Sequence, residues 1–116
     1  MRLADLNASF IRLSEDPQIS RGSFHHVESI AEAQGVIFLC PLCFAANKGR
    51  RGTHSVICWS RSRGVPDDIE PKPGRWALRG TALDDLTLDA EPGQSRSVLL
   101  LGGCNWHGFV TAGEAS

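Results

Sequence analysis

Two short cysteine motifs constrain the fold of this chain more than any other feature. They are Cys40-Pro41-Leu42-Cys43 and Cys104-Asn105-Trp106-His107. Each motif holds two metal-binding side chains three positions apart, so that one tight turn directs both at the same ion. Three thiolates and an imidazole form a tetrahedral Cys3His set, which suits Zn2+. We therefore predict one zinc ion bound by Cys40, Cys43, Cys104 and His107.

The distance between the motifs indicates what the zinc does. They are separated by 60 residues, more than in an ordinary zinc finger, so the ion must join the ends of a sheet rather than close a short loop. A site with four protein ligands has no open position for water or substrate, and its zinc is structural by default. A small core also gains stability from such a link.

Composition favours a single globular domain over residues 1–116. Hydrophobic residues make up 41% of the chain and charged residues 22%, and the net charge of -1 gives no overall attraction to nucleic acid or membrane. No apolar run has the length of a signal peptide or a membrane span. We expect a cytoplasmic protein with reduced thiols and no small-molecule cofactor, with two disulfides as the alternative if it is exported.

The hydrophobic pattern predicts a mainly β fold, a zinc-ribbon-like antiparallel sheet, with a small α+β fold as the alternative. The predicted strands cover residues 24–30, 36–39, 53–60, 76–78, 83–88 and 97–101. Residues 1–13 carry apolar side chains at helical spacing and form either a short helix or an extended arm. Residues 61–74 are rich in Pro and Gly and are predicted to be an exposed loop.

His54 and Cys58 form a second group of metal-binding residue types. In a straight strand they lie on one face about 13 Å apart, so one zinc ion cannot bind both. At most one of them replaces Cys104 or His107 as a ligand. The simpler interpretation is a buried structural cysteine and a hydrogen-bonded structural histidine.

No catalytic residue is assigned from the sequence. Cys58 or Cys104 could pair with a histidine as a nucleophile, but spacing selects no pair. Neither Ser95 nor Ser97 lies in a G-x-S-x-G motif. The adjacent carboxylates Asp67-Asp68 and Asp84-Asp85 are interpreted as turn residues.

The stretch from Lys48 to Arg63 holds five basic residues and no acidic one, and it contains Trp59. Basic residues interleaved with aromatics are typical of surfaces that bind single-stranded nucleic acid. The alternative is a solvated loop whose charge is balanced by nearby acidic residues.

Several segments together resemble a family of small phage and prophage proteins that is classed as a domain of unknown function. The segments are Phe38-Leu39-Cys40-Pro41-Leu42-Cys43-Phe44, Gly52-Thr53-His54, Arg63-Gly64-Val65-Pro66-Asp67-Asp68, Pro73-Gly74-Arg75-Trp76, Gly80-Thr81, Asp85-Leu86-Thr87-Leu88 and Gly103-Cys104-Asn105-Trp106-His107-Gly108-Phe109-Val110. The resemblance covers residues 1–9 and nearly all of the chain from residue 22. It implies a phage accessory protein in the host cytoplasm.

A more distant branch accompanies bacterial ubiquitin-like conjugation operons and is regarded there as a candidate peptidase. Trp76-Ala77-Leu78 and the frame of Cys104 and His107 are similar to it, and Ser97-Val98 stands where that branch has Ser-Ile without the preceding proline. The motifs, the basic stretch and the resemblance together leave three functions open: a macromolecule-binding module with structural zinc, a peptidase-like enzyme, and a single-stranded nucleic-acid-binding zinc ribbon. The partner is an unidentified protein or a nucleic acid, and not a membrane.

Overall fold

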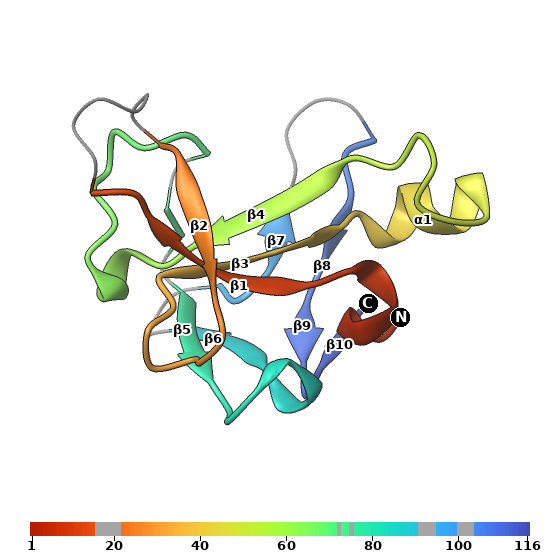
Figure 1. Cartoon of the computed structure of the whole chain (residues 1–116). Helices are drawn as coiled ribbons and strands as arrows, with labels where there is room; N and C mark the ends of the chain where they lie inside the picture. The colour runs from red at the N-terminus through yellow and green to blue at the C-terminus, as the bar shows by residue number, and fades with distance from the viewer. Residues whose placement is uncertain (16–21, 72, 75, 91–94, 100–103) are drawn as a thin grey trace.

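The structure is a computed structural model that describes residues 1–15, 22–71, 73–74, 76–90, 95–99 and 104–116. Its elements are η1 (Leu3–Leu6), β1 (Ser9–Leu13), β2 (Phe24–Val27), β3 (Gly35–Leu39), α1 (Pro41–Asn47), β4 (Ser55–Trp59), η2 (Arg61–Arg63), β5 (Trp76–Arg79), η3 (Leu83–Asp85), β6 (Thr87–Ala90), β7 (Val98–Leu99), β8 (His107–Gly108), β9 (Val110–Thr111) and β10 (Glu114–Ala115). Figure 1 shows α1 projecting from one end of the sheet.

The main sheet has four antiparallel strands in the order β2-β1-β3-β4. Three two-stranded antiparallel ribbons accompany it: β5 with β6, β7 with β8, and β9 with β10. The prediction of a mainly β, antiparallel, single-domain fold is confirmed.

Four predicted elements differ in detail from the structure, the first being the predicted strand 24–30, which ends at Val27 as β2. β1 corrects the helical interpretation of residues 1–13, in which only η1 is helical. The predicted strand 83–88 begins with η3 and becomes β6 only at Thr87. Of the predicted strand 97–101, Val98–Leu99 forms β7, while residues 100–101 lie outside the described residues.

Both faces of the main sheet pack against apolar side chains, because residues alternate between the two sides of a strand. In β4, Val56 and Cys58 join the larger cluster with Phe38, while Trp59 joins a smaller one. The smaller cluster consists of Ile11, Trp59, Val65 and Ile69. Residues 61–74 are predicted to be an exposed loop, and most of the described ones are exposed, but Val65, Ile69 and Pro73 within it are buried.

Gly35 illustrates how closely β3 and β4 approach each other. A Cβ atom at this position would lie 2.5 Å from the carbonyl oxygen of Cys58 and 2.9 Å from the Trp59 ring. A side chain there would push β4 away, so glycine lets the strands pair where β3 begins. Gly35 thus permits the close pairing of β3 with β4, on which the site described below depends.

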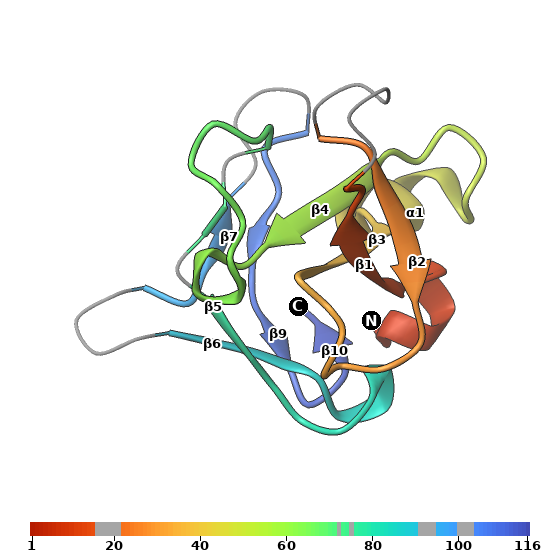
Figure 2. The ribbon, with the colours of Figure 1, turned by 60° about the vertical axis from the view of Figure 1, so that its left-hand side comes forward.

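The two ends of the chain lie side by side (Figure 2). The terminal amino group of Met1 donates to the carbonyl of Ala115 at 2.8 Å and lies 3.3 Å from the Glu114 carboxylate. The backbone N–H of Leu3 bonds to the Gly113 carbonyl at 2.8 Å. The last strands are therefore fixed against η1, next to the main core. Among the described residues, no helix is long and apolar enough to cross a membrane.

Candidate metal centre

The pairing of β3 with β4 brings His54 next to Cys40. Leu39 pairs with Ser55 in the antiparallel ladder. One position further along, Cys40 and His54 therefore stand opposite each other. The backbone N–H of Cys40 donates to the His54 carbonyl at 2.9 Å. Side chains of directly opposed residues share one side of a sheet, with their Cβ atoms about 5 Å apart. The register therefore directs both side chains to the same place.

Helix α1 adds Cys43 to this pair. Cys40 is the N-cap, and Pro41 occupies the first helical position, where its missing N–H costs no hydrogen bond. The backbone N–H of Phe44 closes the first turn on the Cys40 carbonyl at 2.8 Å. One helical turn places the third residue after the cap back over it, so Cys43 returns to Cys40 as the Cys-x-x-Cys spacing predicted.

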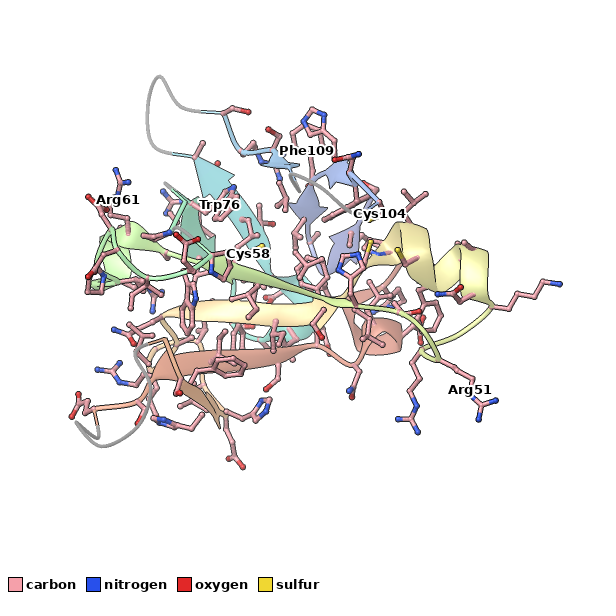
Figure 3. All side chains as sticks on the ribbon, turned by 90° about the horizontal axis from the view of Figure 1, so that it is seen from above. Arg51, Cys58, Arg61, Trp76, Cys104 and Phe109 are labelled. Atoms are coloured by element: carbon pink, nitrogen blue, oxygen red, sulfur yellow. The ribbon has the colours of Figure 1, made fainter. Side chains whose placement is uncertain are left out.

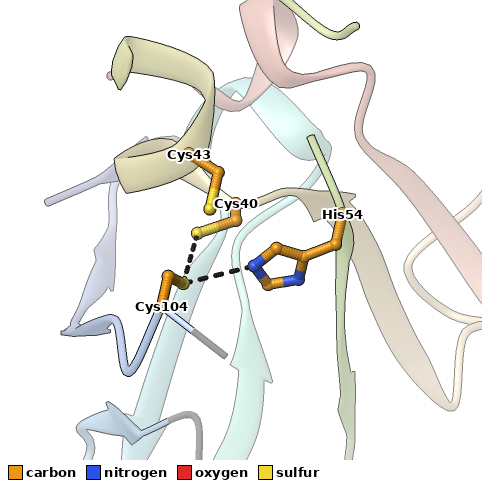
Figure 4. A group of neighbouring side chains, drawn as sticks. All are labelled: Cys40, Cys43, His54 and Cys104. Atoms are coloured by element: carbon orange, nitrogen blue, oxygen red, sulfur yellow. Dashed lines mark hydrogen bonds between the residues drawn. The ribbon is translucent and has the colours of Figure 1, made fainter. Parts of the chain in front are cut away.

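Cys104 completes the group from a distant part of the chain (Figure 4). Its Sγ lies 3.4 Å from the Sγ of Cys40 and 3.2 Å from Nε2 of His54. The four ligand atoms of Cys40, Cys43, His54 and Cys104 all lie within 4.8 Å of one another. All four cysteines of the chain are free thiols. The structure thus contains a Cys3His group that can hold a metal ion.

These distances fit a tetrahedral ion. With metal–sulfur bonds of about 2.3 Å and a metal–nitrogen bond of about 2.0 Å, ideal geometry separates two sulfurs by about 3.8 Å and a sulfur from the nitrogen by about 3.5 Å. The distances from Cys104 Sγ to Cys40 Sγ and to His54 Nε2 are slightly shorter than these ideal values. The separations in the whole group reach up to 4.8 Å, about one ångström more than the ideal sulfur–sulfur distance. The separations therefore lie within about one ångström of those of a tetrahedral zinc site. A disulfide would instead need a sulfur separation of about 2.05 Å.

The second ring nitrogen of His54 supports its role as a ligand. Nδ1 lies 3.3 Å from the carbonyl oxygen of Ser55. When Nε2 binds a metal, Nδ1 keeps the proton and donates a hydrogen bond to this carbonyl. Metal-binding histidines usually make such a hydrogen bond with the nitrogen that faces away from the ion, and it fixes the tautomer.

The thiols perturb one another strongly. His54 lowers the pKa of Cys104 to about 6 through its hydrogen bond, and the backbone N–H of Trp106 acts in the same direction against the effect of burial. The pKa of Cys43 is raised to about 11, first by desolvation and then by the neighbouring Cys104 and Cys40. Three thiols this close cannot all lose their protons unless a cation binds among them. Since binding a cation releases their protons, affinity for the metal falls as the pH falls.

The structure puts His54 in the place that the sequence motif assigned to His107. Residues 106–110 are extended, and burial alternates along them: Trp106, Gly108 and Val110 are buried, while His107 and Phe109 are exposed. Trp106 packs edge-on against Phe38 at 6.0 Å, which turns the next side chain outward. His107 lies beside Phe109, with 6.4 Å between the ring centroids. The predicted Cys104–His107 turn therefore supplies only its cysteine.

Cys58 lies in the main core, as its simpler interpretation predicted. It is paired with Val36, has 1% of its surface exposed, and burial raises its pKa to about 12. It is not in the metal-binding group.

We expect Cys58→Ser to keep the full metal content and to lower the free energy of unfolding by about 1–3 kcal/mol, because it buries a hydroxyl group among apolar side chains. Cys58→Ala, which buries no polar atom, is the control and should be the milder change. Metal analysis together with urea unfolding of both variants tests this. Loss of zinc from either variant would contradict the assignment of the ligands.

The other candidate residues do not form a recognisable site in the described structure. The hydroxyl of Ser97 lies 2.9 Å from that of Ser95, and among the described residues neither serine is hydrogen-bonded to a histidine. Asp85 accepts hydrogen bonds from Thr81 and from the backbone of Ala82, which lowers its pKa and identifies it as a turn residue. Asp67 pairs with Arg61 on the surface at 2.8 Å.

The fold and the site together define the protein as a small β domain with a Cys3His group that can hold a metal ion. No protein-family model matches the chain, and neither a curated protein nor a solved structure is similar enough to count as a match. The functional argument therefore depends on the site itself.

Proposed function

We propose that Cys40, Cys43, His54 and Cys104 bind one Zn2+ and that the ion is structural. The observation that carries this proposal is the convergence of three thiols and one imidazole within 4.8 Å. Soft donors in this number fit zinc better than magnesium or calcium, which prefer oxygen. Four protein ligands fill a tetrahedral ion and leave no position for a substrate.

The zinc would join three segments of the chain. Cys40 and Cys43 connect the end of β3 to α1, His54 precedes β4, and Cys104 lies shortly before the C-terminal strands. Four strands, β4 to β7, separate Cys104 from the other three residues in the sequence. The ion therefore fixes the C-terminal part of the domain to the end of the main sheet, where α1 projects.

Within this proposal the protein is a phage or prophage accessory module that binds a macromolecule. The resemblance described above supports the phage origin, and a structural metal together with a projecting helix suits a binding role. The nucleic-acid alternative loses part of its support. Trp59 is fully buried and cannot stack on a base, and Arg63 donates to the carbonyls of Ile30 and Ala33.

One observation favours the peptidase alternative. The 3.2 Å contact between His54 Nε2 and Cys104 Sγ is also the contact of a nucleophilic cysteine with its base. Two further thiols beside this pair, Cys40 and Cys43, favour metal binding instead. A metal on Cys104 would occupy the lone pair that a nucleophile needs.

The test is the metal content of the reduced protein, measured by native mass spectrometry, combined with hydrolysis of a fluorescent casein substrate. We expect one zinc ion per chain and no hydrolysis. Cobalt substitution should give the visible absorption of a tetrahedral thiolate complex. A folded, metal-free protein whose casein hydrolysis stops when Cys104 is alkylated would overturn the proposal and support a cysteine peptidase.

A further inference from the structure

Helix α1 and the loop that follows it form a projection next to the metal centre. We call six exposed residues of this projection, Leu42, Ala45, Ala46, Lys48, Arg50 and Arg51, the α1 tip. Figure 3 shows Arg51 at this end of the molecule and Arg61 at the opposite end of β4. The basic stretch of the sequence is therefore divided into two separate surfaces, of which only the first is next to the metal centre.

The root of the projection is held in place. Pro41 is buried, and Cys43 and Phe44 pack against the main core. The loop closes where the Cys40 N–H meets the His54 carbonyl, and the hydroxyl of Thr53 donates to the Gly49 carbonyl at 2.7 Å. A surface fixed in this way loses little conformational entropy when it binds a partner.

The α1 tip combines an apolar side chain with positive charge. Leu42 has 49% of its surface exposed, the largest value among the exposed large hydrophobic residues of the described structure. Ala45 and Ala46 beside it in α1 are also exposed. The exposed half of the Leu42 side chain is free to serve as an apolar anchor in an interface.

Within the described part of the chain, the charges of the α1 tip have no partners. Lys48, Arg50 and Arg51 are exposed, and no ion pair or side-chain hydrogen bond joins them to another residue of the described structure. Residues 33–66 contain no acidic residue, although the chain as a whole has a charge of -1. By contrast, Arg61 pairs with Asp67 and Arg79 pairs with Asp89. Positive charge that is unneutralised at one place favours an acidic partner.

We propose that the α1 tip binds an acidic, leucine-containing segment of another protein, with Leu42 in an apolar contact and Lys48, Arg50 and Arg51 opposite carboxylates. This proposal rests on the proposed binding function and specifies its partner. Leu42 favours a protein partner over a nucleic acid, because binding to phosphate groups would need only the cations of the α1 tip. The α1 tip also contains no tryptophan on which bases could stack.

The test uses the zinc-loaded full chain, labelled with 15N, and two probes. One is a synthetic helical peptide with glutamates on one face and leucines on the other. The second is an oligothymidylate. We expect the peptide to shift the amide resonances of residues 41–54 and to bind at least about ten times more weakly to Leu42→Ser and to Arg50→Glu with Arg51→Glu. The affinity should also fall as salt increases.

Matched controls are Phe109→Ser, which removes another exposed hydrophobic side chain, and Arg79→Glu, which changes charge away from the tip. Neither should weaken peptide binding. Zinc content is measured on every sample, so that failure of the metal centre is distinguished from failure of this proposal. The proposal is overturned if the zinc-loaded protein shows no shifts at residues 41–54, or if oligothymidylate binds more tightly than the peptide and Leu42→Ser has no effect.

Discussion

Cys40→Ser is expected to abolish zinc binding and to leave the chain largely unfolded. Cys40 has none of its surface exposed, follows β3, caps α1, and lies 3.4 Å from the thiol of Cys104. Structural zinc sites contribute about 10–16 kcal/mol of apparent binding free energy, which is folding free energy when the unfolded chain has no formed site. That value is comparable to the whole stability of a domain, about 5–15 kcal/mol.

The result is measured as metal content together with the dispersion of the amide NMR spectrum. Cys58→Ser is the matched control, since it makes the same chemical change at another buried cysteine and should keep both zinc and a dispersed spectrum. Treating the wild type with a strong chelator should reproduce the effect of Cys40→Ser. If Cys40→Ser were as stable as Cys58→Ser, the metal would not support the fold, and the structural role would have to be abandoned.

His54→Asn is expected to weaken zinc binding by more than about 100-fold, whereas His107→Asn should leave the affinity unchanged within about twofold. Changes to groups that only support a ligand already cost about 10–100-fold, and loss of a ligand should cost more. Nε2 of His54 lies 3.2 Å from the thiol of Cys104, while His107 is exposed beside Phe109. Competition with a coloured zinc chelator measures both affinities.

His54→Cys provides a rescue for this pair of variants. A set of four cysteine thiolates also binds zinc tetrahedrally, so a thiol in place of the imidazole should restore tight binding, although it extends less far from the backbone. The opposite pattern would contradict the structure: zinc lost from His107→Asn and kept by His54→Asn. Such a result would restore the ligand set that the sequence motifs indicated.

The strands next to the metal centre could be predicted because they carry strong local signals. Val36–Leu39 is a β-branched and aromatic run followed directly by a cysteine, and it became most of β3. The structure of residues 1–13 was harder to predict, because the spacing of Leu3, Leu6 and Phe10 fits a helix although β1 begins at Ser9. Pairing of β1 with both β2 and β3 outweighs that local preference. Helix α1 was not predicted, because only seven residues form it.

The three cysteines of the Cys3His group follow from the sequence, and its histidine does not. The Cys-x-x-Cys spacing is a local property of one helical turn, so Cys40 and Cys43 needed no tertiary information. A signal for His54 was nevertheless present: one predicted strand ended just before Cys40, and the next began beside His54. Only the pairing of Leu39 with Ser55 brings His54 opposite Cys40. A shift of one residue in this register would direct the side chains of Cys40 and His54 to opposite faces of the sheet.

The sequence by itself therefore indicated two things: cysteines and histidines at spacings that suit a metal ion, and a chain whose apolar runs form strands. Residue types and short spacings are sufficient for that, because they act within one turn or one strand. The tertiary structure alone decided which histidine completes the group and that the basic stretch is divided between two ends of the sheet. Both depend on strand register and on side-chain alternation along strands, which are set by contacts between residues far apart in the chain.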